Sequence, residues 1–282
     1  MYTHLVISYF QTNPLLAARQ SGQPTALLSP DLGLTHAEVR LTSSHVELTD
    51  GRQIAWDQIE AVNATPTACF MLEDGTLRKL QLFSEVTNRF CSLLPTSASP
   101  ALLVAGFPMH RIKGTDPHRD TLSKIQAVAP VTGRVLDTAT GLGYTAIQAA
   151  RTAGKVITVE LDPAVLALAR QNPWSQDLFD SPRIAQKVGD TAEVIQEFEA
   201  ASFDRIVHDP PTLSLAGDLY SGEFYVELYR VLRRGGRLYH YLGDPSSHLG
   251  QRTGKGVHRR LLEAGFSRIR PARAAYGLVA HK

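Results

Sequence analysis

Between residues 134 and 244, apolar segments typical of buried strands alternate with segments that have the apolar period of helices. Strands that recur with helices between them lie parallel in one sheet, because each return to the same edge needs a crossover. The alternation therefore predicts an α/β fold with a doubly wound, mostly parallel sheet. The predicted strands are 134–139, 155–161, 183–190, 204–211 and 236–244, and the predicted helices between them are 145–154, 163–172, 191–201 and 222–236.

The C-terminal residues extend this pattern with two more strands. A helix is predicted over 256–266, where Gly265 is a typical stop signal. The runs 267–275 and 276–282 follow closely enough to form an antiparallel hairpin. We therefore expect a seven-stranded sheet that is completed by an antiparallel C-terminal strand.

Residues 34–95 have a different pattern, with short apolar runs separated by turn residues. Two Asp-Gly pairs, Asp50-Gly51 and Asp74-Gly75, predict tight β-hairpins, because both turn positions require a positive φ. One amphipathic helix is predicted over 84–94, and a breaker-rich stretch follows it. We therefore expect a smaller β-rich domain over residues 1–107 and an α/β domain over residues 108–282.

Composition limits the class of protein. Apolar residues make up 43% of the chain and charged residues 20%, as in ordinary globular proteins. No apolar run reaches the roughly 20 residues needed to cross a bilayer, and the N-terminus lacks the features of a signal peptide. We therefore expect a cytoplasmic protein with no membrane partner. Cys69 and Cys91 have no metal-like spacing, and no metal site is predicted.

Charge is distributed unevenly along the chain. Residues 230–282 contain twelve Lys or Arg and two acids, a net charge of +10, although the whole chain carries +2. This asymmetry favours an anionic partner such as structured RNA, and a solvated basic face is the alternative. A small-molecule substrate and a homodimer through the β-rich domain are further hypotheses. Arg252, Lys255, Arg259 and Arg260 are expected to contact the polyanion, whereas Arg268 and Arg270 are expected to be solvated or paired with acids of the β-rich domain.

Polar residues follow four of the predicted strands in the α/β domain. The first strand ends in Asp137 and a small-residue turn, and the next three strands end in Glu160, Asp190 and Asp209. Ligands of open α/β sheets bind at this carboxyl edge, where a glycine turn admits a phosphate or nucleoside and an acid holds a ribose. Each of these features taken alone is also compatible with a purely structural role. Together, in this order, they predict a nucleoside cofactor site.

These features resemble the class I S-adenosylmethionine-dependent methyltransferases over Thr115 to Lys282. The family's first motif corresponds to Asp137, Ala139, Gly141 and Gly143, with Ala139 in place of a glycine. We expect its methyl group to crowd the methionine end of the cofactor without excluding it. The resemblance implies S-adenosyl-L-methionine as cofactor, a ribose-binding role for Glu160 and an adenine-binding role for Asp190. The cofactor-binding residues that we predict are Asp137, Thr138, Ala139, Gly141, Gly143, Tyr144, Glu160, Leu161, Asp190 and Thr191. Residues 106–236 also resemble an uncharacterised, mainly archaeal group of predicted methyltransferases, which implies no substrate.

The sequence "HDPPT" at 208–212 carries the catalytic prediction. It resembles the Asp/Asn-Pro-Pro-aromatic motif of amine methyltransferases, whose carboxylate and backbone carbonyl accept hydrogens from the amine. Thr212 replaces the aromatic residue, and Tyr220 is expected to supply a ring. The predicted catalytic residues are Asp209, Pro210, Pro211 and Tyr220, although a Pro-Pro turn that only closes a strand is the alternative. Strand alternation turns His208 away from Asp209, so we expect a buried histidine.

Methyl transfer to a nitrogen nucleophile is the leading hypothesis for the reaction. An aminopropyltransferase of the spermidine synthase type, which uses decarboxylated S-adenosylmethionine and carries a small β domain ahead of this fold, is the alternative. A polyamine substrate would need an acidic pocket, for which Asp218, Glu223 and Glu227 are candidates beside Asp209. A binding module without chemistry is the third hypothesis. Arg111, Lys113 and Asp116 belong either to a lid over the cofactor or to an interdomain linker.

Overall fold

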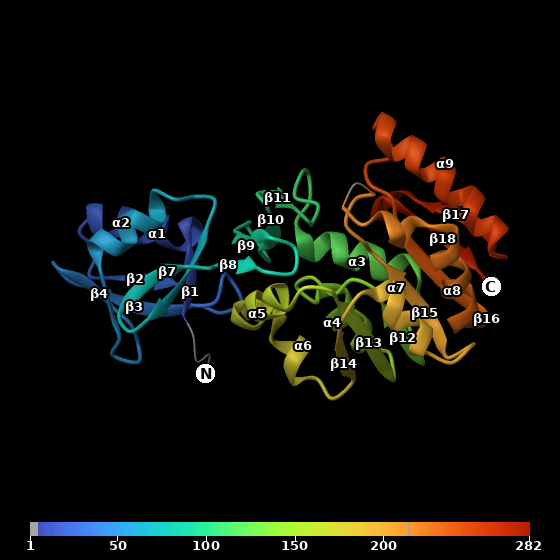
Figure 1. Ribbon diagram of the computed structural model, residues 1–282. Helices are drawn as coiled ribbons and strands as arrows, with labels where there is room; N and C mark the ends of the chain where they lie inside the picture. The colour runs from blue at the N-terminus through green and yellow to red at the C-terminus, as the bar shows by residue number, and fades with distance from the viewer. Residues whose placement is uncertain (1–4, 214) are drawn as a thin grey trace. The chain divides into compact units, whose positions relative to one another are not determined.

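The computed structural model describes residues 5–213 and 215–282. The chain forms two compact units, one of Met1–His118 with Ala164–Gln176 and the other of Arg119–Pro163 with Asp177–Lys282 (Figure 1). The boundary predicted between residues 107 and 108 falls inside strand β11 (Phe107–Pro108), which pairs with β10 (Ala101–Val104).

The second unit contains one seven-stranded sheet in the order β14-β13-β12-β15-β16-β18-β17. The five strands from β14 to β16 are parallel, β18 runs antiparallel to β16, and β17 runs antiparallel to β18. The predicted α/β class and the predicted antiparallel C-terminal hairpin are therefore confirmed. The strands are β12 (Arg134–Asp137), β13 (Lys155–Glu160), β14 (Ile184–Val188), β15 (Phe203–His208), β16 (Leu232–Tyr241), β17 (Ser267–Ala272) and β18 (Gly277–His281).

The five helices predicted after residue 116 are present in the predicted order with different ends, and the helices over 117–127 and 176–180 were not predicted. Together these helices are α3 (Pro117–Ala127), α4 (Tyr144–Ala150), α5 (Pro163–Gln171), α6 (Gln176–Asp180), α7 (Thr191–Val194), α8 (Gly222–Val231) and α9 (His248–Glu263). The helix predicted to reach residue 236 ends at Val231, because Leu232 already pairs with Phe203 in the sheet. The helix predicted from residue 256 begins at His248, where the Ser247 hydroxyl accepts from the Gly250 N–H and caps it. No helix in the described part of the chain has both the length and the apolar character needed to cross a bilayer.

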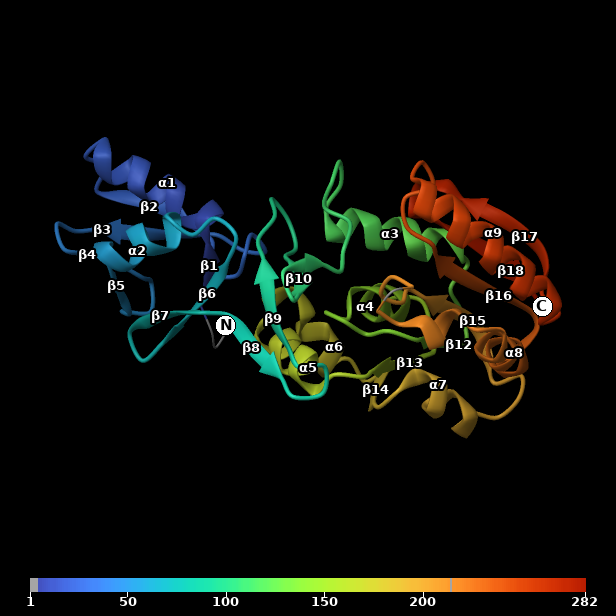
Figure 2. The same cartoon turned by 45° about the horizontal axis from the view of Figure 1, so that its top comes forward.

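One face of the sheet packs against α8 and α9. Four residues at equivalent positions on adjacent strands are fully buried there: Leu136, Ile206, Leu238 and Ala280. They share a core cluster with Leu228 of α8 and Leu261 of α9. Because burying one leucine contributes about 1.5–3 kcal/mol, Leu261→Ala would cost about 2–5 kcal/mol of stability. Helix α3 lies on the opposite face of the sheet from α8 (Figure 2), and the two faces are therefore covered as in a doubly wound fold.

The described part of the first unit contains three small antiparallel sheets, the helices α1 (Tyr9–Gln20) and α2 (Trp56–Asn63), and most of α5. Its remaining strands are β1 (Val6–Ser8), β2 (Thr25–Leu28), β3 (Ala37–Leu41), β4 (His45–Glu47), β5 (Gln53–Ala55), β6 (Cys69–Glu73), β7 (Thr76–Lys79), β8 (Gln81–Ser84) and β9 (Arg89–Leu94). Both predicted Asp-Gly hairpins are present. Gly51 (φ +86°) joins β4 to β5, and Asp74 (φ +48°) with Gly75 (φ +74°) joins β6 to β7.

The prediction of a helix over residues 84–94 is wrong. This segment forms the end of β8, a turn, and strand β9. Asn88 in the turn has a positive φ of 53°, which interrupts a helix. Cys91 and Leu93 are fully buried, two residues apart, and a spacing of two is the period of a strand rather than that of a helix.

Candidate active site

The loop between β12 and α4 combines two glycines with open space. A Cβ atom on Gly143 (φ +79°) would lie 2.7 Å from Cδ2 of Leu178, so both conformation and packing require glycine there. A Cβ atom on Gly141 (φ +52°) would meet no atom within 4 Å, and a ligand therefore has room beside this residue. Ala139 is not among the described residues with positive φ, which explains why a non-glycine residue is accepted at this position.

Glu160 at the end of β13 is bound to the glycine loop. Its Oε2 accepts from the Gly141 N–H (2.7 Å) and its Oε1 accepts from the Asp162 N–H (3.1 Å). Burial raises the pKa of Glu160 to about 7, although the two backbone hydrogen bonds act in the opposite direction. The neighbouring Leu161 is 47% exposed. The structure thus brings the predicted ribose acid to the predicted glycine loop.

Asp137 is fully buried at the end of β12. Its Oδ2 accepts from the Thr158 hydroxyl (2.8 Å) and its Oδ1 from the Thr145 hydroxyl (3.2 Å). Burial raises the pKa of Asp137 to about 7, and the negative charges of Asp209 and Glu160 act in the same direction. The carboxyl group therefore connects the end of β12 to β13 and to the first turn of α4, and it feels the negative charges of the other two acids.

The third strand contributes Asp190 and Thr191. Asp190 caps α7, where its Oδ1 accepts from the Ala192 N–H (2.8 Å), and its Oδ2 accepts no hydrogen bond from the described residues. The Thr191 hydroxyl donates to the Thr138 carbonyl (2.7 Å) and so connects this turn to the glycine loop. Tyr144, the first residue of α4, is only 7% exposed. An open glycine turn together with two half-buried acceptors, Glu160 and Asp190, fits the predicted nucleoside cofactor.

Asp209 follows β15 and forms an ion pair that the sequence analysis did not predict. Its Oδ2 lies 2.7 Å from Nζ of Lys124, which also lies 2.8 Å from Oδ2 of Asp120 on the same helix. The side chains of Lys124 and Asp120 are 3% and 1% exposed, and that of Asp209 is 18% exposed. Oδ1 of Asp209 accepts no hydrogen bond from the described residues. One carboxylate oxygen is therefore held, and the other remains available to a ligand.

Burial and charge act in opposite directions on this ion pair. Burial raises the pKa of Asp209, Lys124 lowers it, and Asp120 raises it again. For Lys124, burial favours the neutral amine, but the charges of Asp209 and Asp120 hold its pKa above the ordinary value. The ammonium group of Lys124 therefore stays protonated between two carboxylates.

Tyr220 and His208 are two buried side chains next to the turn formed by Pro210 and Pro211. Tyr220 is 3% exposed and its hydroxyl donates to the Pro211 carbonyl (3.0 Å), so it supports the turn and does not present an exposed ring. His208 is fully buried, with Nδ1 2.7 Å from the Thr138 hydroxyl and Nε2 2.9 Å from the Leu219 carbonyl. Burial lowers its pKa to about 3, which keeps the ring neutral. The predicted buried histidine is confirmed.

Some candidate residues lie away from this site. Glu227 pairs with Arg230 (2.7 Å), whose guanidinium donates to the Phe198 and Ile195 carbonyls, so Glu227 has a structural role in α8. Asp218 and Glu223 are exposed. Arg111, Lys113 and Asp116 belong to the other compact unit, and their lid role stays a prediction.

Lys124 and Asp120 are the functional candidates that the sequence analysis missed. A signal was present, because an acid and a lysine four residues apart in "DTLSK" lie on one face of a helix. Such pairs are usually exposed. Only the tertiary contact between Lys124 on α3 and Asp209 after β15 shows that the Asp120–Lys124 pair is buried.

The sequence is similar to known proteins in the same region. A family model described as a methyltransferase domain matches residues 135–236. The uncharacterised protein MJ1233 of Methanocaldococcus jannaschii is 42% identical over 231 residues, which cover 81% of this chain and 78% of that protein.

Two further relatives are more distant. The polyamine aminopropyltransferase of Mycobacterium tuberculosis is 27% identical over 252 residues, which are 86% of this chain but 43% of that protein. Putrescine N-methyltransferase 4 of Nicotiana tabacum is 27% identical over 140 residues, 48% of this chain and 36% of that protein. The chain thus spans less than half the length of either enzyme.

Among solved structures, a spermidine synthase in complex with a transition-state analogue matches with a TM-score of 0.57 and 22% identity. The match covers 65% of this chain and 64% of that chain, and it is a likeness of fold.

Proposed function

This chain belongs to the class I S-adenosylmethionine-dependent methyltransferases, and from that premise we propose that it methylates a nitrogen atom of a small amine bound at Asp209. The observation that carries this proposal is the carboxylate of Asp209, with Oδ2 held by Lys124 and Oδ1 unoccupied by the described residues. S-adenosylmethionine supplies a methyl group that is already activated by its sulfonium. The protein therefore has to orient the nitrogen and accept its proton.

Asp209 performs both tasks in this proposal. The amine is bound as a cation, and one of its N–H groups donates to Oδ1. Transfer of this proton to Oδ1 frees the nitrogen lone pair, and the N–C bond then forms as the S–C bond breaks. A carboxyl group whose pKa is raised by burial is a better proton acceptor near neutral pH than an exposed one. Pro210 and Pro211 restrict the backbone after Asp209, and the Tyr220 hydroxyl fixes the Pro211 carbonyl.

The charge of the site supports an amine as acceptor. Asp209 and Asp120 carry two negative charges and Lys124 one positive charge, so the group keeps a net charge of −1. A buried negative group attracts a cationic amine and favours its approach. The printed names of the aminopropyltransferase and of the putrescine N-methyltransferase also refer to amine substrates. Thr212, in place of a stacking aromatic residue, is exposed and argues against a nucleobase.

RNA is the second candidate acceptor, and the charge of α9 favours it. Arg252, Lys255 and Arg259 are exposed on this helix, and its N-terminal end follows the carboxyl end of β16. Arg259 is partly compensated by Glu263 at 3.6 Å. Polyanion binding by these residues would be strongly dependent on salt.

Aminopropyl transfer is the alternative reaction. It is supported by the 27% identity to the polyamine aminopropyltransferase over 86% of this chain, a range that includes the N-terminal unit. It would require the same proton acceptor, so the two reactions differ in the donor and not in the role of Asp209. The structural role of Glu227 leaves fewer acids for a polyamine pocket.

The test compares two donors with one panel of acceptors. Calorimetry with S-adenosylmethionine and with its decarboxylated form measures donor preference. Mass spectrometry of reactions with diamines, polyamines and total cellular RNA then detects a mass increase from one methyl group or from one aminopropyl group. A methylated amine product supports the proposal. Aminopropylated products, or methylation confined to RNA, would replace it with one of the other two candidates.

A further inference from the structure

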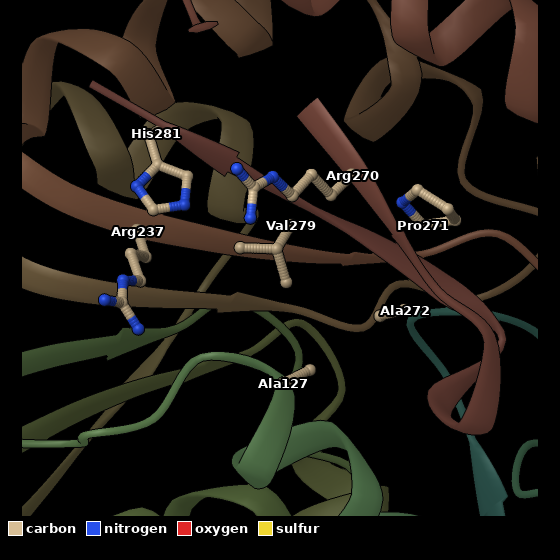
Figure 3. A pocket seen from close by; sticks show the side chains of 7 residues that line it. All are labelled: Ala127, Arg237, Arg270, Pro271, Ala272, Val279 and His281. Carbon is tan, nitrogen blue, oxygen red and sulfur yellow. The ribbon is translucent and has the colours of Figure 1, made fainter. Parts of the chain in front are cut away.

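A cationic pocket lies against β16, β18 and β17 at one lateral edge of the sheet, whereas Asp209 follows β15. It has a volume of about 360 Å³ and is lined by Ala127 of α3 and by six residues of β16, β17 and β18. Figure 3 shows the side chains of Arg237, Arg270 and His281 around Val279. None of the described residues that line this pocket is acidic.

Strand register explains why the basic side chains meet. Arg205 on β15 is opposite Arg237 on β16, and Arg237 is opposite His281 on β18. Arg270 on β17 is opposite Val279, which lies two residues before His281 and hence on the same face. Four basic residues from four adjacent strands therefore project from one face of the sheet, where like charges at opposite positions destabilise the pairing.

The four basic side chains differ in the partners of their nitrogen atoms. Nε of Arg205 donates to the carbonyls of Val128 and Pro130 (3.0 and 2.9 Å), and Arg237 donates to the Ala129 carbonyl. These carbonyls follow the C-terminal end of α3, which is a favourable place for a cation. The guanidinium of Arg270 and the ring of His281 have no hydrogen-bond or ion-pair partner among the described residues.

The electrostatic environment of His281 indicates that the positive charges are close together. Its pKa is lowered by burial and then by the charges of Arg237, Arg268, Arg270 and Arg205. Burial and the charge of Arg237 also lower the pKa of Arg205, whereas Asp204 raises it. Asp204 itself pairs with Arg233 (2.7 Å), so its charge is already shared. The pocket therefore has an uncompensated positive potential.

We propose that this pocket binds a phosphate group, which Arg270 and His281 contact directly with support from Arg237. A guanidinium has planar donors that match phosphate oxygens, and an anion between these side chains would relieve their mutual repulsion. The phosphate belongs either to an RNA backbone or to a small phosphorylated compound. Arg237 of the pocket lies opposite Arg205 on β15, and Arg205 lies four residues before Asp209, about 13 Å at the spacing of a strand, so the phosphate site is separate from the methyl-transfer site.

The first experiment measures inorganic phosphate binding to the whole protein by calorimetry and by thermal unfolding, at constant ionic strength set with sodium chloride. Arg270→Gln is compared with the wild type and with the matched control Arg151→Gln, which changes an exposed arginine of the same unit. We expect Arg270→Gln to weaken phosphate binding on the order of tenfold to a hundredfold, because a charge-assisted hydrogen bond is lost. His281→Gln should weaken it as well, and Arg151→Gln should not.

The second experiment identifies the source of the phosphate. RNA binding is measured over a salt series for the same variants. If the backbone phosphate of RNA occupies the pocket, Arg270→Gln lowers the slope of log K against log salt by about 0.7 to 0.9. Unchanged RNA binding together with weakened phosphate binding assigns the pocket to a small phosphorylated compound. Absence of phosphate binding in the wild type, or equal binding by wild type and Arg270→Gln, overturns the proposal.

Discussion

Lys124 and Asp209 form a buried ion pair, Nζ to Oδ2 2.7 Å, although 85 residues separate them in the chain. The pair fixes the rotation of the Asp209 carboxylate, because Oδ2 is held by an ammonium group that Asp120 also holds. The remaining oxygen, Oδ1, is the one that can accept a hydrogen from a substrate. The chemistry at the end of β15 therefore depends on a residue of α3.

Replacement of Asp209 by Asn should remove turnover and leave cofactor binding nearly unchanged. The amide cannot accept the amine proton, and general-base catalysis contributes about 10²- to 10⁴-fold. Turnover of the methylated amine and the dissociation constant of S-adenosylhomocysteine measure the two effects separately. Asp218→Asn, which changes an exposed acid of the same unit, is the matched control. Full activity of Asp209→Asn would move the proton acceptor to another group.

Replacement of Lys124 by Met should destabilise the protein by about 3–5 kcal/mol, because removing one partner leaves buried charge uncompensated. Denaturation in urea measures this loss. In the double variant Asp120→Asn/Lys124→Met one of the two buried negative charges is also removed, so part of the stability should return. If the double variant is less stable than Lys124→Met, the charge explanation is wrong.

The same Lys124→Met variant should shift the acidic limb of the pH-rate profile. Lys124 lowers the pKa of Asp209, so its removal raises that pKa, and the ionised acceptor is present only at higher pH. We therefore expect activity to appear at higher pH than in the wild type, in the fraction of enzyme that remains folded. An unchanged profile would show that Asp209 is not the group whose ionisation limits the rate.

Glu160 should make cofactor binding dependent on pH. The pKa of Glu160 is raised by burial to about 7, and ribose hydroxyls donate better to the ionised carboxylate than to the neutral acid. Affinity for S-adenosylhomocysteine should therefore increase as pH rises through about 7. Glu160→Gln should bind on the order of tenfold to a hundredfold more weakly above this pH and with a smaller pH dependence. Glu193→Gln, which changes an exposed acid on α7, is the control, and equal affinity of the two variants would exclude a ribose role.

Asp137 should make the free protein less stable as pH rises. Its pKa is raised from 3.8 to about 7 in the folded state, so between these values the folded protein binds more protons than the unfolded chain. Stability is greatest below the unfolded value and decreases through the folded one. Asp137→Asn keeps the size of the side chain, and its stability relative to the wild type should increase between pH 4 and pH 7, on the order of 2–4 kcal/mol.

Guanidinium denaturation at several pH values measures this difference. Asp180→Asn, an exposed change for which no large effect is expected, is the control. If the stability difference between Asp137→Asn and the wild type is the same at every pH, the carboxyl group does not titrate between 3.8 and 7.

Local patterns in the sequence predicted most of the second unit. The order of strands and helices, the antiparallel hairpin of β17 and β18, and the placement of Asp137, Glu160, Asp190 and Asp209 after successive strands all follow from apolar period and turn residues. Boundaries were less predictable. Residues 232–236 were predicted as the end of a helix, but pairing of β16 with β15 makes them part of a strand. Residues 84–94 were predicted as one helix, but the positive φ of Asn88 places a turn between β8 and β9.

The sequence by itself determined the fold class and the row of acids at the carboxyl edge of the sheet, because both depend on residues that are near one another in the chain. Only the tertiary structure decided which charges compensate one another. Lys124 joins Asp209 through the packing of α3, and Arg237, Arg270 and His281 meet through the register of three strands. Register and helix packing are set by the whole core, and electrostatic energy depends on distance and burial, so a list of charged residues cannot specify such pairs.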